Sequence, residues 1–298
     1  MFELADHSGS DGIASHLQYW TYVVDESNPF MQIHVDTMIL TVTIATLMVS
    51  FGIWLKGKIV EGAPEGAQNF METIVGFIND TVNDNFPVHN PMIAPLAFTI
   101  FIFILLCNTL DILPAYLIGY TASLISAIGS GHEFVWGGHM PSFHMRPVPT
   151  NDLNLPAAMG VSVFLLVLYY EFKLKPVHFC KELLLQPFAS LLLDAKNPMV
   201  KFLGVLIIPI NLILKLVEEI AKPLSLSFRL FGNMFAGEVI FLLIASLLLG
   251  GGVVATTAGF FVGLGWSFFH LFIGLLQAFI FMILTVVYLS IAHQPAEH

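Results

Sequence analysis

Long apolar runs separated by short polar segments make up most of this 298-residue chain. Each run reaches or exceeds the roughly 17–25 residues with which an α-helix crosses the hydrocarbon core of a bilayer. The runs cover residues 37–55, 93–110, 156–172, 202–250 and 253–292. The pattern therefore predicts an all-α, polytopic membrane protein in which a single membrane domain, residues 37–293, holds five transmembrane helices.

A different pattern occupies residues 64–84, between the first two runs. Apolar residues recur there at spacings of three and four, and polar residues fill the remaining positions, as expected of an amphipathic helix. The apolar positions are Ala67, Phe70, Met71, Ile74, Val75, Phe77, Ile78 and Val82. We predict an interfacial helix on the inner membrane surface, with a re-entrant or buried helix as the alternative.

The last two runs are too long for helices that cross a membrane upright. Residues 253–292 would form a helix roughly 60 Å long, whereas the hydrocarbon core is about 30 Å thick. Tilting or bending relieves such a mismatch. We therefore predict a long, strongly tilted hairpin that turns at residues 250–252 and presents a broad face to a neighbouring molecule.

Composition agrees with a membrane protein and excludes other classes. Charged residues make up 11% of the chain, less than half of the roughly 25% of soluble domains, and the mean hydropathy is +0.81. The net charge of −10 argues against nucleic-acid binding, which requires a basic surface. The two cysteines, Cys107 and Cys180, lie in different segments and support neither a disulfide scaffold nor a metal centre. We predict no cofactor and no metal.

The distribution of the 11 basic residues predicts the orientation of the chain. Basic residues are enriched in cytoplasmic segments of membrane proteins. With the N-terminus outside, all nine lysines fall in inner segments or at the inner end of the fourth run, and the outer segments hold only Arg146. Residues 1–36 are acidic and lack the basic region of a signal peptide, so they form an outer, periplasmic segment. Residues 294–298 are then a cytoplasmic tail.

Beyond the inner end of the fourth run, three ionisable side chains lie deep in the predicted membrane hairpin: Arg229, Glu238 and His270. An ionisable group at that depth costs about 2.5–3.5 kcal/mol on insertion scales and is by default functional. An arginine keeps its proton in proteins, so Arg229 requires an anion. Glu238 lies nine residues further along, on the opposite helix face at about 100° per residue. We therefore expect the counter-charge to come from another subunit.

Other polar residues share a face or a depth with these three. One stripe of the fourth run consists of Lys222, Ser225, Arg229 and Asn233. Folding the hairpin at its glycine corner brings Arg229 and Gln277 to one depth, and Glu238 and His270 to a second level nearer the outside. Buried carboxyl and imidazole groups can exchange protons near neutral pH, so the second level suits a proton wire that opens to the outside.

Each of these residues also has a structural interpretation. Arg229 could anchor its helix or reach an interface with its long side chain. Glu238 and His270 could form a static pair, and the amides of Asn233 and Gln277 could hold helices together. For the whole chain, the alternatives are a secondary transporter that binds an anion through Arg229 and a structural anchor without a conduction path. The chain has no internal repeat of the kind found in many transporters.

Two further groups of polar residues are a charged cluster in the fourth run and three histidines in the outer loop. Lys215, Glu218 and Glu219 stand at i, i+3 and i+4, a spacing typical of an ion cluster on a helix surface. Three histidines of the outer loop match no spacing of known metal ligands; they are His132, His139 and His144. The outer loop therefore predicts no metal site.

Four segments carry a resemblance to a known family. Residues 225–238 (SLSFRLFGNMFAGE) and 276–290 (LQAFIFMILTVVYLS) resemble signature sequences of subunit a of the bacterial F-type ATP synthase. Residues 108–114 (NTLDILP) and 149–154 (PTNDLN) also match that family. The resemblance extends over residues 34–292, and the arginine-centred motif is long and specific.

The resemblance implies a membrane stator subunit that is not itself catalytic. Subunit a of this family lies beside the ring of c subunits in the bacterial inner membrane, together with the b-subunit peripheral stalk and the rest of the F1Fo complex. It conducts protons through two offset half-channels, and it loads and unloads the ring carboxylates. The predicted hairpin would face the ring. Glu238 and His270 favour protons over Na⁺ as the transported ion.

The resemblance also implies roles for individual residues. Arg229 matches the essential arginine that separates the half-channels, and Gln277 matches its partner. The residues that match the proton path are Glu238, His270, Asn233, Asp111 and Ser225. Lys215 stands where many relatives carry a glutamate near the inner exit, so Glu218 and Glu219 are expected to serve that exit.

Overall fold

The computed structural model describes residues 21–23, 32–60, 62–63, 65–88, 90–110, 148–185, 198–250 and 252–294. The chain divides into two compact units, each assembled from three stretches of sequence. The first unit comprises residues 1–62, 102–155 and 231–278, and the second comprises residues 63–101, 156–230 and 279–298. The two longest helices contribute residues to both units.

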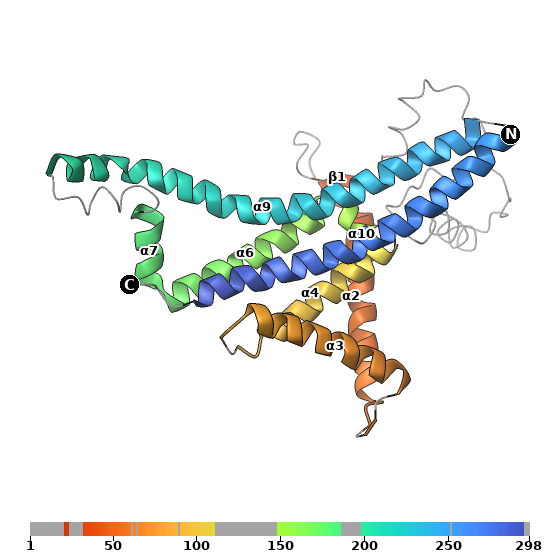
Figure 1. The fold of residues 1–298 in the computed structure, drawn as a ribbon, viewed down its shortest axis with the longest axis horizontal. Helices are drawn as coiled ribbons and strands as arrows, with labels where there is room; N and C mark the ends of the chain where they lie inside the picture. The colour runs from red at the N-terminus through yellow and green to blue at the C-terminus, as the bar shows by residue number, and fades with distance from the viewer. Residues whose placement is uncertain are drawn as a thin grey trace. The chain divides into compact units, whose positions relative to one another are not determined.

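Helices account for most of the described residues (Figure 1). In chain order the elements are β1 (Thr21–Val23), β2 (Gln32–His34), α2 (Val35–Lys56), α3 (Gly66–Asn85), α4 (Ile93–Thr109), the 3-10 turn η2 (Pro149–Asn151), α6 (Asn154–Leu174), α7 (Pro176–Leu185), α9 (Pro198–Gly250) and α10 (Val253–His293). In the part of the chain that the structure describes, four helical stretches are long and apolar enough to cross a membrane; they are Val35–Lys56, Asn154–Leu174, Leu206–Ile244 and Thr257–His293. Helix α4 is also apolar and has 17 residues. The predicted helical, multi-pass character is therefore confirmed, while the number of five spans stays a prediction.

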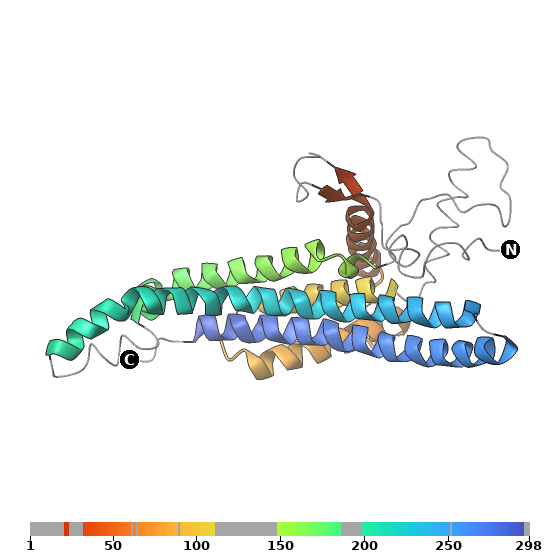
Figure 2. The ribbon, with the colours of Figure 1, turned by 90° about the horizontal axis from the view of Figure 1, so that it is seen from above.

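A small sheet at the start of the first unit was not predicted. Strands β1 and β2 pair antiparallel, with Thr21 opposite His34, and β2 leads directly into α2 (Figure 2). The prediction treated residues 1–36 only as an acidic segment. Strands of three residues are too short to show the alternation of apolar and polar positions on which strand prediction depends.

The polar start of α2 is buried in the first unit. Asp36 is fully buried, and its Oδ1 accepts a hydrogen bond from the Thr37 backbone N–H at 2.8 Å. The turn η2 packs against this end of α2. Most large apolar side chains further along α2 are exposed, including Val42, Leu47 and Ile53. Such a surface suits contact with lipid.

In the second unit, α6 packs closely against the part of α9 that precedes residue 231. A Cβ atom at Gly160 would overlap the Ser227 hydroxyl and lie 2.9 Å from the Pro223 carbonyl oxygen. Ser227 donates to the carbonyl oxygens of Pro223 at 2.7 Å and Pro156 at 3.0 Å. The backbone of α9 remains helical through Pro209 and Pro223, so neither proline ends the helix.

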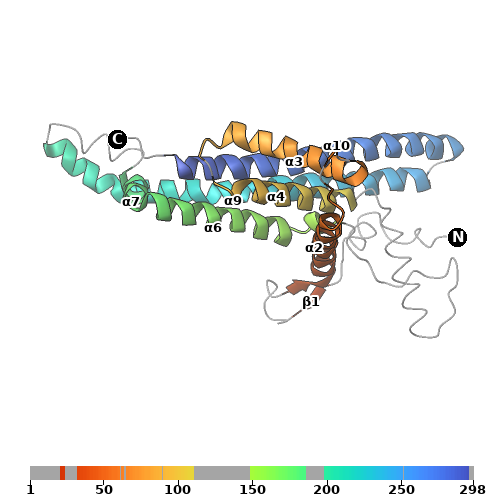
Figure 3. The same ribbon diagram turned by 90° about the horizontal axis from the view of Figure 1, so that it is seen from below.

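The amphipathic segment forms α3, and its apolar face is only partly covered. Ile78 and Val82 are buried, whereas Phe70 and Val75 are exposed. Helix α3 lies beside the last part of α10 in the second unit, where the rings of Phe77 and Phe279 are 5.9 Å apart (Figure 3). An interfacial position of α3 on the membrane stays a prediction.

Candidate functional site

In the first unit, two amides join α9 to α10. The Asn233 Nδ2 donates to the Gln277 Oε1 at 2.8 Å, and Gln277 is only 2% exposed. Among the described residues, the Gln277 Nε2 has no hydrogen-bond partner. Asn233 lies four residues, or about one helical turn, after Arg229 in α9. The structure therefore brings two of the predicted site residues together one turn from the arginine.

Gly237 follows Asn233 by four residues in α9. Its backbone lies against the ring of His270, which belongs to α10. The space that a Cβ atom of residue 237 would occupy is filled by this ring. His270 is 4% exposed, and Phe241 and Trp266 place their rings 5.8 and 6.2 Å from it. Glu238 follows Gly237 directly and is half-buried. The structure thus puts Glu238 and His270 at the same level of the hairpin.

A second polar group in the first unit was not assigned from the sequence. The Asp152 Oδ2 accepts a hydrogen bond from the Thr37 hydroxyl at 2.8 Å and lies 2.6 Å from the His34 Nδ1. Asp152 and Asp36 are both buried. These side chains come from the start of α2 and the segment before α6, so only the tertiary fold reveals that they meet.

Hydrogen bonds continue from this segment to α10. Thr150 donates to the Asn108 Oδ1 at 2.8 Å, and the Asn108 Nδ2 donates to the Gly274 carbonyl oxygen at 3.1 Å. Thr150 and Asn108 are buried. Gly274 stands between His270 and Gln277 in the sequence of α10. The motifs 108–114 and 149–154 could have indicated this connection, because both contain buried polar residues that require partners.

In the second unit, Arg229 and Ser225 lie on the predicted stripe of α9. Arg229 is half-buried and Ser225 is exposed, whereas the next residue after each, Leu226 and Leu230, is buried. Within the described part of the chain, no acidic side chain forms an ion pair with Arg229. A counter-charge from another molecule stays a prediction.

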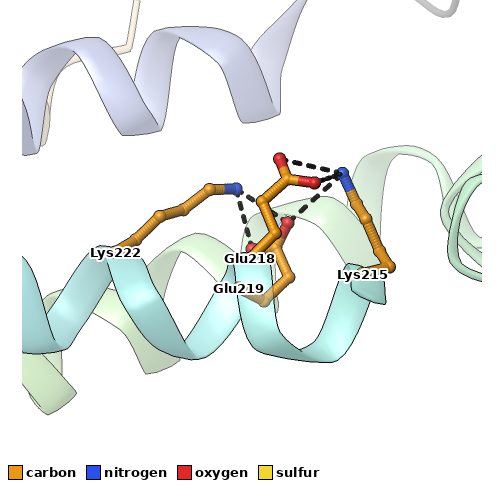
Figure 4. Close-up of polar contacts among 4 residues, drawn as sticks. All are labelled: Lys215, Glu218, Glu219 and Lys222. Atoms are coloured by element: carbon orange, nitrogen blue, oxygen red, sulfur yellow. Dashed lines mark hydrogen bonds and ion pairs between the residues drawn. The ribbon is translucent and has the colours of Figure 1, made fainter. Parts of the chain in front are cut away.

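Near the start of α9, four charged side chains form a connected group (Figure 4). Both Glu219 oxygens accept hydrogen bonds from the Lys222 Nζ, at 2.7 and 2.8 Å. The Lys215 Nζ lies 3.5 Å from the Glu219 Oε1 and 3.3 Å from the Glu218 Oε2. The Glu219 side chain is only 6% exposed, whereas that of Glu218 is 59% exposed. The sequence predicted a solvated cluster, but Lys215 and Glu219 are buried.

Some predicted features lie outside the described residues. Asp111 and the three outer-loop histidines belong to this group. Among the residues that are described, no cluster of histidine, cysteine, aspartate or glutamate could hold a metal ion.

Comparison with known proteins decides the family. A family model described as ATP synthase A chain matches residues 37–290. The chain belongs to the ATP synthase subunit a family. It is 41% identical to ATP synthase subunit a of Pseudomonas fluorescens over 266 residues, which cover 89% of this chain and 85% of that protein. It is 38% identical to ATP synthase subunit a of Pseudomonas putida over 306 residues, which cover 98% of this chain and 99% of that protein.

Membership of the subunit a family confirms the resemblance seen in the sequence motifs. It supports a multi-pass protein of the bacterial inner membrane that works in ion transport and ATP synthesis. It also supports a proton-translocating part in the Fo sector of the F1Fo complex, a part that is not itself catalytic. Family membership does not by itself assign a role to any individual side chain.

Proposed function

We propose that this chain is the proton-channel stator subunit of the Fo motor, with two offset half-channels separated by Arg229. One observation carries the proposal. Along α9, the half-buried Arg229 precedes Asn233 by about one helical turn, and Asn233 is hydrogen bonded to the buried Gln277. One turn further, the backbone of Gly237 contacts His270 beside Glu238. A fixed positive charge therefore borders a run of polar and titratable side chains.

The outer half-channel consists of Glu238, His270 and Asn233, with Asp111 on the same path. Burial of His270 and its level beside Glu238 support this assignment, because a proton relay requires exchangeable groups within reach of one another. Protons enter from the outside, pass these groups and load a carboxylate of the c-ring. His270 is buried, Glu238 is half-buried and Asn233 is exposed, so the three groups range from the protein interior to its surface.

Arg229 has two functions in this mechanism. Its guanidinium remains protonated, so it cannot pass a proton from one half-channel to the other. Its charge favours the ionised form of an approaching ring carboxylate, so the proton leaves as that carboxylate arrives. Gln277 supports this region as the partner of the arginine, and Ser225 lies on the same helix stripe. The membrane potential contributes about 2.3 kcal/mol per charge for each 100 mV.

The inner exit passes Glu218 and Glu219. The two carboxylates lie ten or eleven residues before Arg229, towards the lysine-rich side of the membrane. Glu219 is buried and Glu218 is exposed, so the pair extends from the protein interior to its surface. Lys215 and Lys222 compensate the negative charge.

In this arrangement five helices span the membrane, α3 lies on its inner surface, and the N-terminus is periplasmic. The α9–α10 hairpin faces the c-ring, and the b-subunit stalk holds the chain against rotation. The nine lysines on one side support the orientation, and the long apolar helices support the spans. No cofactor takes part.

Substitution of Arg229 tests the proposal. In inverted membrane vesicles that contain the whole ATP synthase, Arg229→Ala should abolish ATP-driven acidification, because the barrier and the counter-charge are both lost. ATP hydrolysis by the soluble head should persist. Thr46→Ala is the control, since Thr46 is exposed and its hydroxyl bonds only within α2. Normal acidification by Arg229→Ala would refute the proposal.

A further inference from the structure

The second unit has a small, partly open cavity that is lined by α6, α9 and α10. Its volume is about 20 Å³, and one water molecule requires roughly 10–15 Å³. The lining includes Gly160, Val167, Glu171, Lys222, Leu226 and Tyr288. Three of the lining residues carry polar groups; they are Glu171, Lys222 and Tyr288. A buried water requires two to four polar partners. The cavity is therefore suited to a single water molecule.

Lys222 connects this cavity with the charged group of Figure 4. Its side chain lines the cavity, and its Nζ binds both oxygens of the buried Glu219 at 2.7 and 2.8 Å. Lys215 lies on the other side of Glu219, at 3.5 Å. The cavity lining includes Leu226, three residues before Arg229, and the polar contacts continue from Lys222 through Glu219 to Lys215.

We propose that this cavity and the Lys222–Glu219–Lys215 group form the inner proton passage, with Glu171 and Glu219 as the carboxylates that carry the proton. The inference rests on the proposed function and deepens it, because it assigns Glu171, Tyr288 and both lysines to the inner half-channel. Glu171 comes from α6, so the passage is built between helices and is not confined to the surface of α9.

The chemistry of the passage balances at each step. A ring carboxylate gives its proton to water in the cavity, and the resulting hydronium ion passes that proton to a carboxylate oxygen of the passage. The carboxylic acid then gives its proton to water on the inner side. Each carboxylate returns to its starting charge, and no electron is transferred. Lys222 has no acceptor lone pair as an ammonium ion, so it is a positioning residue: it lines the cavity and holds both oxygens of Glu219. The two ammonium groups also offset the cost of burying the carboxylate.

Neutral variants of the two carboxylates test this passage. In inverted vesicles with whole ATP synthase, Glu171→Gln and Glu219→Gln should each lower ATP-driven acidification per assembled complex by roughly tenfold or more, because a positioned proton-transfer group contributes about 10²–10⁴-fold. Glu72→Gln is the matched control, since Glu72 is an exposed carboxylate on α3. Its acidification should equal that of the unmodified enzyme.

Conservative variants separate proton transfer from a structural role. Glu219→Asp keeps a carboxylate and should restore a large part of the acidification lost in Glu219→Gln. If both glutamine variants pump normally per assembled complex, the passage is refuted, even where the amount of complex falls. If Arg229→Ala does not pump in the same experiment, the proposed function stands and only this passage is wrong. If Arg229→Ala also pumps normally, the proposed function itself is refuted.

Access of a small cation provides a second, independent test. In a Cys180→Ser background, Val167→Cys places a thiol in the cavity lining, whereas Leu165→Cys on the same helix lies on an exposed apolar face. Ag⁺ added to inverted vesicles should inhibit acidification by the Val167→Cys enzyme and leave the Leu165→Cys enzyme active. Equal sensitivity of the two variants, or resistance of both, would contradict a water-filled passage.

Discussion

Gly237 determines how closely α9 can approach His270 in the first unit. The His270 ring occupies the place where any other residue would put its Cβ atom, and the ring is 4% exposed, so it has little room to move away. The motif that contains Gly237 was assigned from the sequence because of its charges. The structure adds a steric reason for the glycine.

Gly237→Ala should therefore reduce both stability and proton transport. Overpacking in a tight contact costs about 1–3 kcal/mol, and the imidazole would be displaced from its level beside Glu238. Thermal inactivation and ATP-driven acidification of the purified, reconstituted complex would report the two effects. Gly52→Ala is the control, because a Cβ atom there meets nothing within 4 Å. Unchanged acidification by Gly237→Ala would show that the position of His270 is unimportant.

At the residue scale, the sequence identified side chains better than it identified their partners. Arg229, Glu238 and His270 stand out because charge in an apolar run is rare and costly. The contact of Asp152 with Thr37 and His34 could not be predicted, because it joins segments more than 110 residues apart. The burial of Glu219 was also missed, since helical spacing alone gives the contacts along one helix and not the helices packed against it.

At the element scale, the long helices follow from the apolar runs because a helix satisfies its own backbone hydrogen bonds inside a membrane. Helix α7 and the strands β1 and β2 were not predicted, because they are short and lack a long apolar period. The closest approach between helices depends on small residues. Gly160 on α6 meets Pro223 and Ser227 on α9, in the manner of small-residue contacts between membrane helices.

Gly160→Ala should separate α6 from α9 and destabilise the second unit by about 1–3 kcal/mol. The added methyl group would meet the Ser227 hydroxyl and the Pro223 carbonyl oxygen. The double variant Gly160→Ala/Ser227→Ala should recover only part of the loss, because the Pro223 backbone cannot be removed. A double-mutant cycle based on thermal inactivation measures this coupling. Strict additivity of the two changes would contradict the contact.

At the scale of the whole molecule, the few charges decide orientation. All nine lysines fall on the inner side of the predicted arrangement, and this bias sets the direction in which a membrane protein inserts. Cys180 on α7 is exposed and Cys107 is buried. Cys180 can therefore be labelled to report which side of the membrane α7 faces. Orientation is decisive for the mechanism, because an outer route past His270 and an inner route past Glu219 require opposite ends of α9 to face opposite compartments.

A membrane-impermeant maleimide should therefore label Cys180 in inverted vesicles and not in intact right-side-out vesicles. Permeabilised right-side-out vesicles are the control, since labelling there shows that other subunits leave the thiol accessible. Tyr22→Cys in a Cys180→Ser background should give the opposite result, because Tyr22 is 62% exposed on β1 and belongs to the outer segment. Labelling of Cys180 from the outside would reverse the orientation, and it would exchange the proposed entrance and exit of the proton.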